Sequence, residues 1–187
     1  NYVHNPDEKW EDNFKEVIET LDGLVKEGKI RHYGVSNESS WGVMRHLNES
    51  NYNNLTRCKT IQNSYSLLNR TFEINLAEVS MRENVGLLAY SPLGFGMLSG
   101  KYLNGNLPNN SRLKLFPAYS RYSNPQALKL TALYAELAKQ NNLSLAELSL
   151  AFVNQRPFVT ANIIGATTME QLKENIDSFG DLIVLLP

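Results

Sequence analysis

The feature that most restricts how this chain can fold is a fourfold alternation of short apolar segments with longer segments of helical spacing. Strand candidates lie at residues 30–37, 60–63, 85–90 and 158–164, and a helical pattern follows each of them. Such an alternation predicts a parallel sheet with right-handed crossovers, either an open doubly wound sheet or a barrel. In both architectures ligands bind at the carboxyl ends of the strands, so the residues that end each strand are the first candidates for a site.

Helical spacing of apolar residues predicts the elements around these strands. Residues 14–26 form an amphipathic pattern that Gly28 ends, and Ser144 with Glu147 predicts a capping box at the start of a later helix. Residues 91–124 are rich in Gly, Pro and Asn without a clean period, which predicts a long functional loop. We expect these residues on inner helix faces: Trp41, Met44, Leu47, Phe72, Leu76, Val79, Leu130, Leu133, Leu137, Ala138, Leu172, Ile176 and Phe179.

Composition excludes several classes of partner. The chain has 187 residues, which predicts one domain, and its 18 basic and 19 acidic residues create no field that would attract nucleic acid or an anionic membrane. We find no transmembrane run, signal peptide or metal-ligand pattern. The single cysteine, Cys58, fits a reducing compartment, so we expect a cytoplasmic protein. Because the chain opens without methionine and stops on an apolar run, we expect it to be part of a longer protein.

Polar residues stand at the ends of all four strand candidates. Taken singly, each has a structural explanation, such as a helix cap for Ser36 and Asn37 or a core position for Tyr90. Their joint occurrence favours a binding site, because ligand contacts must converge at the strand ends and structural caps need not. The residues concerned are Ser36, Asn37, Gln62, Asn63, Tyr90, Ser91, Gly165, Ala166 and Thr167.

Four ordered segments resemble motifs of the aldo-keto reductase family, most closely its Tas-like branch. Residues 28–37 read GKIRHYGVSN, residues 61–70 read IQNSYSLLNR, residues 88–94 read LAYSPLG, and residues 164–168 read IGATT. The resemblance implies a TIM-type (β/α)8 barrel, of which residues 1–187 supply about strands five to eight as a half barrel. In that layout residues 1–12 are a loop, residues 91–124 a long loop, and residues 180–187 an unmatched tail.

The resemblance implies that this half barrel binds NADP(H). Ser36, Asn37 and Gln62 are expected to hydrogen-bond the nicotinamide carboxamide, which needs both donors and an acceptor. Tyr90 is expected to stack on the nicotinamide ring.

The same resemblance assigns the phosphate and adenine contacts. The diphosphate is expected to contact the turn Ser91-Pro92-Leu93-Gly94 and Lys101, and Arg112 is expected near the adenosine phosphate. The ribose that carries the 2′-phosphate is expected to contact Gly165 and Thr167. Adenine is expected to contact Gln171, Glu174 and Asn175. Many relatives carry Arg where this chain has Gln171, so NAD(H) stays open as the lesser alternative. Taken alone, Lys101 and Arg112 could also be ordinary surface charges.

The family's chemistry is hydride transfer from reduced nicotinamide to the carbonyl of an aldehyde or ketone, with a Tyr acid supported by Lys, Asp and His. These residues are expected upstream of this chain, so the chain alone would lack the catalytic set. His4 is a candidate for the catalytic histidine, but the preferred explanation is that it is a loop histidine. The expected partners are a small carbonyl substrate and the missing barrel half or a second copy. Two alternatives remain: a nucleotide-sensing module resembling potassium-channel β subunits, and an unrelated flavodoxin-like domain.

Overall fold

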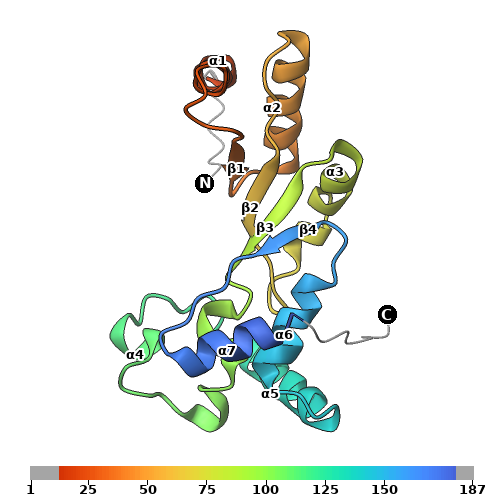
Figure 1. Ribbon diagram of the computed structural model, residues 1–187. Helices are drawn as coiled ribbons and strands as arrows, with labels where there is room; N and C mark the ends of the chain where they lie inside the picture. The colour runs from red at the N-terminus through yellow and green to blue at the C-terminus, as the bar shows by residue number, and fades with distance from the viewer. Residues whose placement is uncertain (1–12, 180–187) are drawn as a thin grey trace, which may run out of the picture.

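The computed structural model describes residues 13–179 (Figure 1). Its elements in chain order are α1 (Phe14–Lys26), β1 (Gly34–Ser36), α2 (Ser40–Tyr52), β2 (Thr60–Ser64), η1 (Thr71–Glu73), α3 (Leu76–Glu83), β3 (Gly86–Tyr90), η2 (Gly94–Ser99), η3 (Leu103–Gly105), α4 (Arg112–Leu115), α5 (Pro125–Gln140), α6 (Leu145–Asn154), β4 (Val159–Asn162) and α7 (Met169–Asp177). The predictions for His4, for the loop at 1–12 and for the tail at 180–187 concern residues outside this range.

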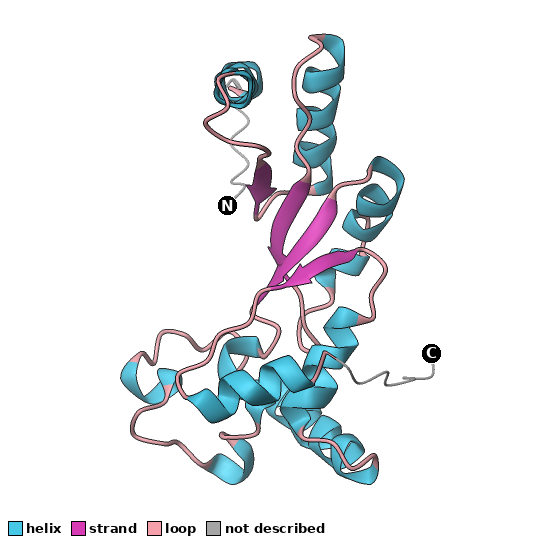
Figure 2. Cartoon of the chain, viewed as in Figure 1, coloured by secondary structure: helices cyan, strands magenta, loops and turns pink. Residues whose placement is uncertain are grey.

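The four strands form one parallel sheet whose spatial order, β1-β2-β3-β4, is also their order in the chain (Figure 2). Ser36 lies opposite Gln62, and Gln62 lies opposite Leu88. A doubly wound sheet reverses its strand order at a switch point, and no reversal occurs among the described strands. The flavodoxin-like alternative is therefore wrong for this part of the chain, whereas sequential order is what a barrel requires.

Capping side chains start several helices where the sequence predicts them. Ser144 Oγ accepts a hydrogen bond from the Glu147 amide, and the Glu147 carboxylate accepts one from the Ser144 amide, so the predicted capping box of α6 is confirmed. The cap of α2 is Ser39, which accepts from the Gly42 amide. The cap explanation for Ser36 and Asn37 is therefore wrong.

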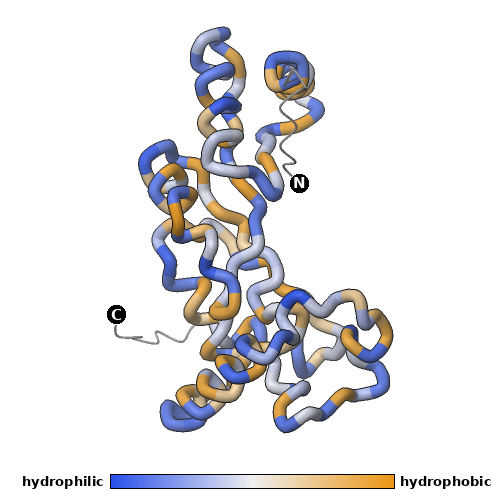
Figure 3. Tube along the Cα trace, turned by 180° about the vertical axis from the view of Figure 1, so that it is seen from behind, coloured by the Kyte–Doolittle hydropathy of each residue, from blue (hydrophilic) through white to orange (hydrophobic). Residues whose placement is uncertain are grey.

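One face of the sheet packs against the helices and carries the core. Ile61, Leu87 and Ala89 are buried there together with residues of α2 and α6. Tyr65 stacks on Phe152 of α6, with ring centroids 5.7 Å apart. Hydrophobic and hydrophilic residues alternate along the helices, as Figure 3 shows, and α2, α3, α5 and α6 contribute apolar residues to this core.

The opposite face of the sheet carries an alternation of glycine and threonine across neighbouring strands. A Cβ added to Gly34 would collide with the side chain of Thr60, and a Cβ added to Gly86 would collide with that of Thr160. Each glycine therefore leaves the space that the adjacent threonine fills. Gly34 and Thr160 are exposed, so no described segment fully covers this face.

Two strands are shorter than predicted. β1 is limited to residues 34–36, and the predicted segment begins in the turn after α1, where the Ile30 amide donates to Leu24 O at 3.3 Å. β4 ends at Asn162, beyond which Ile163 and Ile164 line a pocket. Ile163 and Ile164 led us to predict a longer strand, but their apolar side chains form part of the wall of a pocket.

Several apolar residues that we expected on inner helix faces are exposed. In α2 the buried apolar residues are Val43 and Leu47, while Trp41 is 66% exposed. The spacing of apolar residues predicts a helix, but it does not fix which side of the helix is buried. The packing of neighbouring elements decides that side. The predictions were wrong for Trp41, Leu133, Leu137, Ile176 and Phe179.

The predicted loop at 91–124 is a series of short helical turns with its own small core. Met97, Tyr102 and Tyr122 are buried together in it. Phe95 has a φ of 57°, a left-handed conformation that is uncommon for a bulky side chain. The absence of a clean period in the sequence reflects these brief, changing turns.

Candidate functional site

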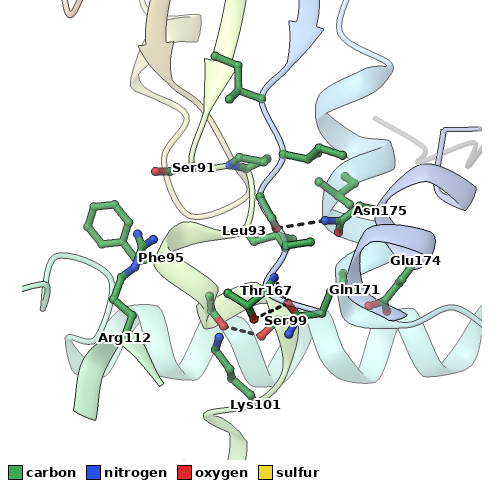
Figure 4. Close-up of a pocket in the computed structure, with 18 of the residues that line it drawn as sticks. Ser91, Leu93, Phe95, Ser99, Lys101, Arg112, Thr167, Gln171, Glu174 and Asn175 are labelled. Atoms are coloured by element: carbon green, nitrogen blue, oxygen red, sulfur yellow. Dashed lines mark hydrogen bonds between the residues drawn. The ribbon is translucent and has the colours of Figure 1, made fainter. Parts of the chain in front are cut away.

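A pocket of about 580 Å³ lies between the residues that follow β3 and those that follow β4 (Figure 4). We call it the β3–β4 pocket. Most of the predicted cofactor-binding residues line it: Ser91, Pro92, Leu93, Lys101, Arg112, Gly165, Thr167, Gln171, Glu174 and Asn175. Ser91 and Gly165, 74 positions apart in the sequence, thus share one cavity.

Lys101 is held over a glycine on one wall of this pocket. A Cβ added to Gly96 would lie 2.8 Å from Lys101 Cε and 3.0 Å from its Nζ, so a side chain at this position would displace the lysine. The Nζ also lies 5.4 Å from the centre of the Tyr102 ring. These contacts keep a positive charge at the pocket wall.

Arg112 begins α4 and is positioned by aromatic rings. Its guanidinium carbon lies 5.6 Å from the centre of the Phe95 ring and 5.7 Å from that of Tyr119. Both distances are within the range of cation–π attraction. Lys101 and Arg112 therefore differ from freely solvated surface charges, although Arg112 is exposed.

The wall formed by α7 is fixed by hydrogen bonds around its first turn. Thr168 caps the helix by accepting from the Gln171 amide. The Gln171 side-chain oxygen accepts from the amide and the hydroxyl of Thr167, at 2.9 and 3.0 Å. Because its oxygen is occupied in this way, Gln171 has its amide NH₂ group left to offer to a ligand.

Two further α7 residues are held by partners outside the helix. Asn175 is buried and donates to Gly165 O at 3.2 Å. Glu174 accepts a hydrogen bond from Ser144 Oγ, 2.6 Å away, so the serine that caps α6 also orients this carboxylate. No heavy atom lies within 4 Å of a Cβ added to Gly165, so the chain passes the pocket there with open space beside it.

The remaining predicted residues meet at the ends of β1, β2 and β3, which we call the β1–β3 site. Tyr90 donates its hydroxyl hydrogen to Asn37 Oδ1 at 2.6 Å, and Asn37 Nδ2 donates to Ser36 Oγ at 3.3 Å. Ser36 Oγ in turn donates to Gln62 O at 3.2 Å. Tyr90 is only half-buried and hydrogen-bonded, so its explanation as a core residue is wrong.

Asn37 has a left-handed backbone, with a φ of 54°. Asparagine tolerates this region better than most residues do. The backbone N–H of Asn37 donates to Gln62 O, at the end of β2, at 2.9 Å. Gly94, the last predicted residue, is buried in the turn after β3 and lines neither the pocket nor the strand ends. Its φ of 53° indicates a role in shaping that turn.

Sequence reasoning missed several residues of the site. Phe95, Ser99, Asn110, Phe116, Ile163 and Ile164 also line the β3–β4 pocket. A second pocket, also about 580 Å³, lies on the β1–β3 side and is lined by Asn37, Asn63, Ser64, Thr71, Phe72, Leu76, Tyr90 and Arg121. An aromatic-rich stretch with two arginines, residues 112–122, was the sequence signal that could have pointed to Phe116 and Arg121.

Two buried tyrosines are engaged in structural hydrogen bonds. Tyr33 donates to Thr56 O at 2.8 Å, and Tyr65 donates to Glu73 Oε1 at 2.5 Å. Burial raises the pKa of both hydroxyls, and the Glu73 hydrogen bond raises that of Tyr65 further, which makes them poor proton donors. Within residues 13–179 no cluster of His, Cys, Asp or Glu is arranged to hold a metal ion, and no helix is long and apolar enough to cross a membrane.

Comparison with known proteins identifies the family. A family model described as the Aldo/keto reductase family matches residues 1–184. The protein tas of Escherichia coli (strain K12) is 52% identical over 174 residues, which are 90% of this chain and 50% of that protein. The L-glyceraldehyde 3-phosphate reductase of Escherichia coli (strain K12) is 32% identical over 193 residues, 97% of this chain and 53% of that protein.

A more distant relative is a probable voltage-gated potassium channel subunit beta of Oryza sativa subsp. japonica. It is 27% identical over 191 residues, 100% of this chain and 57% of that protein. The chain thus spans about half the length of the curated relatives it matches. The family match and the identity to the first of these relatives show that the chain belongs to the aldo/keto reductase family.

Proposed function

We propose that the protein to which this chain belongs reduces aldehydes or ketones to alcohols with NADP(H), and that this chain forms the cofactor-binding half of its barrel. The observation that carries the proposal is the adjacency of the two sites at the end of β3. Tyr90 belongs to the β1–β3 site, and the next residue, Ser91, lines the β3–β4 pocket. One extended dinucleotide spanning both would use every strand end of the sheet.

The chemistry of the two sites suits the two ends of such a molecule. The β3–β4 pocket offers the cations Lys101 and Arg112, which suit phosphate groups, and the amide and carboxylate groups of Asn175 and Glu174, which suit a purine edge. The β1–β3 site offers a half-exposed aromatic ring and uncharged hydrogen-bonding groups, which suit nicotinamide. The residues present therefore fit the cofactor that the family uses.

A reduced nicotinamide supplies a hydride, and with it both electrons, to the carbonyl carbon, while the carbonyl oxygen takes a proton from an acid. In the proposed enzyme this chain orients the ring: Tyr90 defines one face, and its hydrogen bond turns the Asn37 amide so that Nδ2 points away from the phenol. The acid and its supporting residues are expected in the other half. One relative is named as a reductase of a phosphorylated aldehyde, which supports a carbonyl substrate.

Two features support the half-barrel. Alternation of Gly34, Thr60, Gly86 and Thr160 across the strands is the pattern of a barrel interior, where alternate strands fill each layer. The face that carries them is exposed here, and the family has a barrel fold. We propose that a further set of strands, from the same protein or from a second copy, covers this face.

We also propose a cytoplasmic location, because the buried free thiol of Cys58 fits a reducing compartment.

The test is turnover by the full-length protein. Purified protein with NADPH and a simple aldehyde should oxidise NADPH in proportion to the alcohol formed, and residues 1–187 expressed alone should give no rate above background. A full-length protein that binds NADPH tightly but reduces none of a panel of aldehydes and ketones would refute the reductase. That outcome would favour the second candidate, a nucleotide-sensing module, for which the 27% identity to a potassium-channel subunit is the motivating observation.

A further inference from the structure

The second pocket, beside the β1–β3 site, contains one charged residue, Arg121, among the described residues that line it. It shares Asn37 and Tyr90 with the β1–β3 site and shares no lining residue with the β3–β4 pocket. Its polar groups besides Arg121 are uncharged amides and hydroxyls. No acidic side chain among these lining residues opposes the charge of Arg121, which is exposed at the edge of the cavity.

The guanidinium of Arg121 lacks an acidic partner among residues 13–179, although several other arginines have one. Arg57 pairs with Glu83, Arg70 with Glu73, and Arg82 with Glu78. Arg121 instead has its guanidinium carbon 6.0 Å from the centre of the Phe95 ring. An aromatic contact positions an arginine without using its charge, so its N–H donors remain for a ligand.

The backbone that presents Arg121 is fixed by its neighbour. Tyr122 is 6% exposed and packs its ring 5.1 Å from that of Phe95. Asn69, in the connection after β2, donates to the Tyr122 hydroxyl at 3.4 Å. The backbone at Arg121 is thus fixed by the buried Tyr122, while the Arg121 side chain itself is exposed and contacts the Phe95 ring.

The Phe95 ring lies close to one cation of each pocket. Arg112 lies 5.6 Å from the centre of the same ring and lines the β3–β4 pocket, where Lys101 also lies. The phosphates of a dinucleotide in the β3–β4 pocket therefore have their own cations. Arg121 lines only the second pocket and is therefore available to a different anionic group, in the cavity that Tyr90 also lines.

We propose that Arg121 binds a terminal carboxylate or phosphate group of the carbonyl substrate, so that the preferred substrates are aldehydes or ketones with an anionic end. The inference rests on the proposed reductase function and on Tyr90 marking the nicotinamide end of the cofactor. Arg121 provides a bidentate pair of donors for either anion. Because the contact lies away from the reacting carbonyl, it acts on substrate affinity and selection.

The experiment compares matched substrates in the full-length protein. The pairs are 4-oxobutanoate against butanal, for a carboxylate, and glyceraldehyde 3-phosphate against glyceraldehyde, for a phosphate. In Arg121→Met we expect kcat/KM for the preferred anionic aldehyde to fall by about 10- to 100-fold, mostly through KM, as for the loss of one charge-assisted pair. Values for the neutral aldehydes and KM for NADPH should stay within about twofold.

Two variants control this comparison. Arg121→Lys keeps the charge but not the bidentate geometry and should recover part of the loss. Arg82→Met removes an exposed arginine of α3 that pairs with Glu78 and should change none of the constants. An equal loss for charged and neutral aldehydes, or a rise in KM for NADPH in Arg121→Met, would overturn the proposal and assign the arginine to the cofactor.

A binding measurement covers the case in which no aldehyde is reduced. Titration of the NADPH-loaded protein with succinate, followed by the fluorescence of the bound cofactor, should saturate in the wild type and weaken at least tenfold in Arg121→Met. Succinate binding without turnover would leave the anion site standing while the reductase function fails. Absence of succinate and inorganic phosphate binding, together with unchanged selectivity, would refute the anion site itself.

Discussion

The β3–β4 pocket and the β1–β3 site, on either side of the β3 end, differ in how they hold their side chains. In the β3–β4 pocket, Lys101 and Arg112 are positive and are positioned by a glycine and by aromatic rings. In the β1–β3 site a chain of neutral hydrogen bonds joins Tyr90, Asn37 and Ser36. We therefore expect the β3–β4 pocket to contribute cofactor affinity through charge and the β1–β3 site to contribute orientation through geometry.

The largest expected effect tests the charged pocket. Lys101→Ala should weaken NADPH binding by about 10- to 100-fold, and Arg112→Ala by somewhat less because Arg112 is more exposed. Arg112→Ala should weaken NADPH more than NADH, whereas Lys101→Ala should weaken both because the diphosphate is common to the two cofactors; dissociation constants from cofactor fluorescence measure this. Lys114→Ala, an exposed residue in α4 outside the pocket lining, is the control. An equal loss for both cofactors in Arg112→Ala would reject the adenosine-phosphate assignment of Arg112.

A smaller effect is expected at Tyr90, and it should be confined to the nicotinamide end. Tyr90→Ala should weaken NADPH by up to about tenfold, since it removes an aromatic face, whereas Tyr90→Phe keeps the face and loses only the bond to Asn37. Binding of adenosine 2′,5′-bisphosphate, which lacks nicotinamide, should be unchanged in both variants. A loss of that fragment's affinity would mean that the two sites do not divide the cofactor as proposed.

Ser144 makes two contacts: it caps α6, and it hydrogen-bonds Glu174, which we propose contacts adenine. Ser144→Ala frees the Glu174 carboxylate, so the preference for NADPH over its hypoxanthine analogue should fall by a few fold. The same change removes the α6 cap and costs about 1 kcal/mol of stability. Asn124→Ala, which removes the cap of α5, should cause a similar stability loss with no change in this preference. Equal changes in both variants would show that Glu174 acts only through the stability of the fold.

The smallest effect on binding is expected at Asp22, which lies outside both pockets. Its carboxylate accepts hydrogen bonds from Lys26 and from the hydroxyl and amide of Thr56, and these contacts lower its pKa to about 2. A lowered carboxyl pKa stabilises the fold above the unfolded-state value of about 3.9, and this contribution is lost as the pH falls from about 4 toward 2. Asp22→Asn should flatten the acid limb of stability in urea titrations at a series of pH values, with NADPH affinity at pH 7 unchanged. An unaltered acid limb would show that the carboxylate contributes nothing to it.

Much of the fold follows from local patterns in the sequence. The Ser144–Glu147 capping box, the helix at 14–26 and the alternation of strands and helices all depend on interactions within a few residues. The sequence also predicted that strand-end residues such as Asn37 and Gln62 lie together, because parallel strands place their carboxyl ends on one edge of the sheet.

The sequence alone determined the order and type of the elements, and the motifs placed the family's polar residues at the strand ends. Only the tertiary structure decided that Trp41 faces solvent, that Ser144 reaches Glu174, and that Arg121 faces a pocket beside Tyr90. The reason is physical: caps and periodicity are set by neighbours in the chain, whereas the direction of a buried stripe and the partner of a charge depend on which distant segments pack against it.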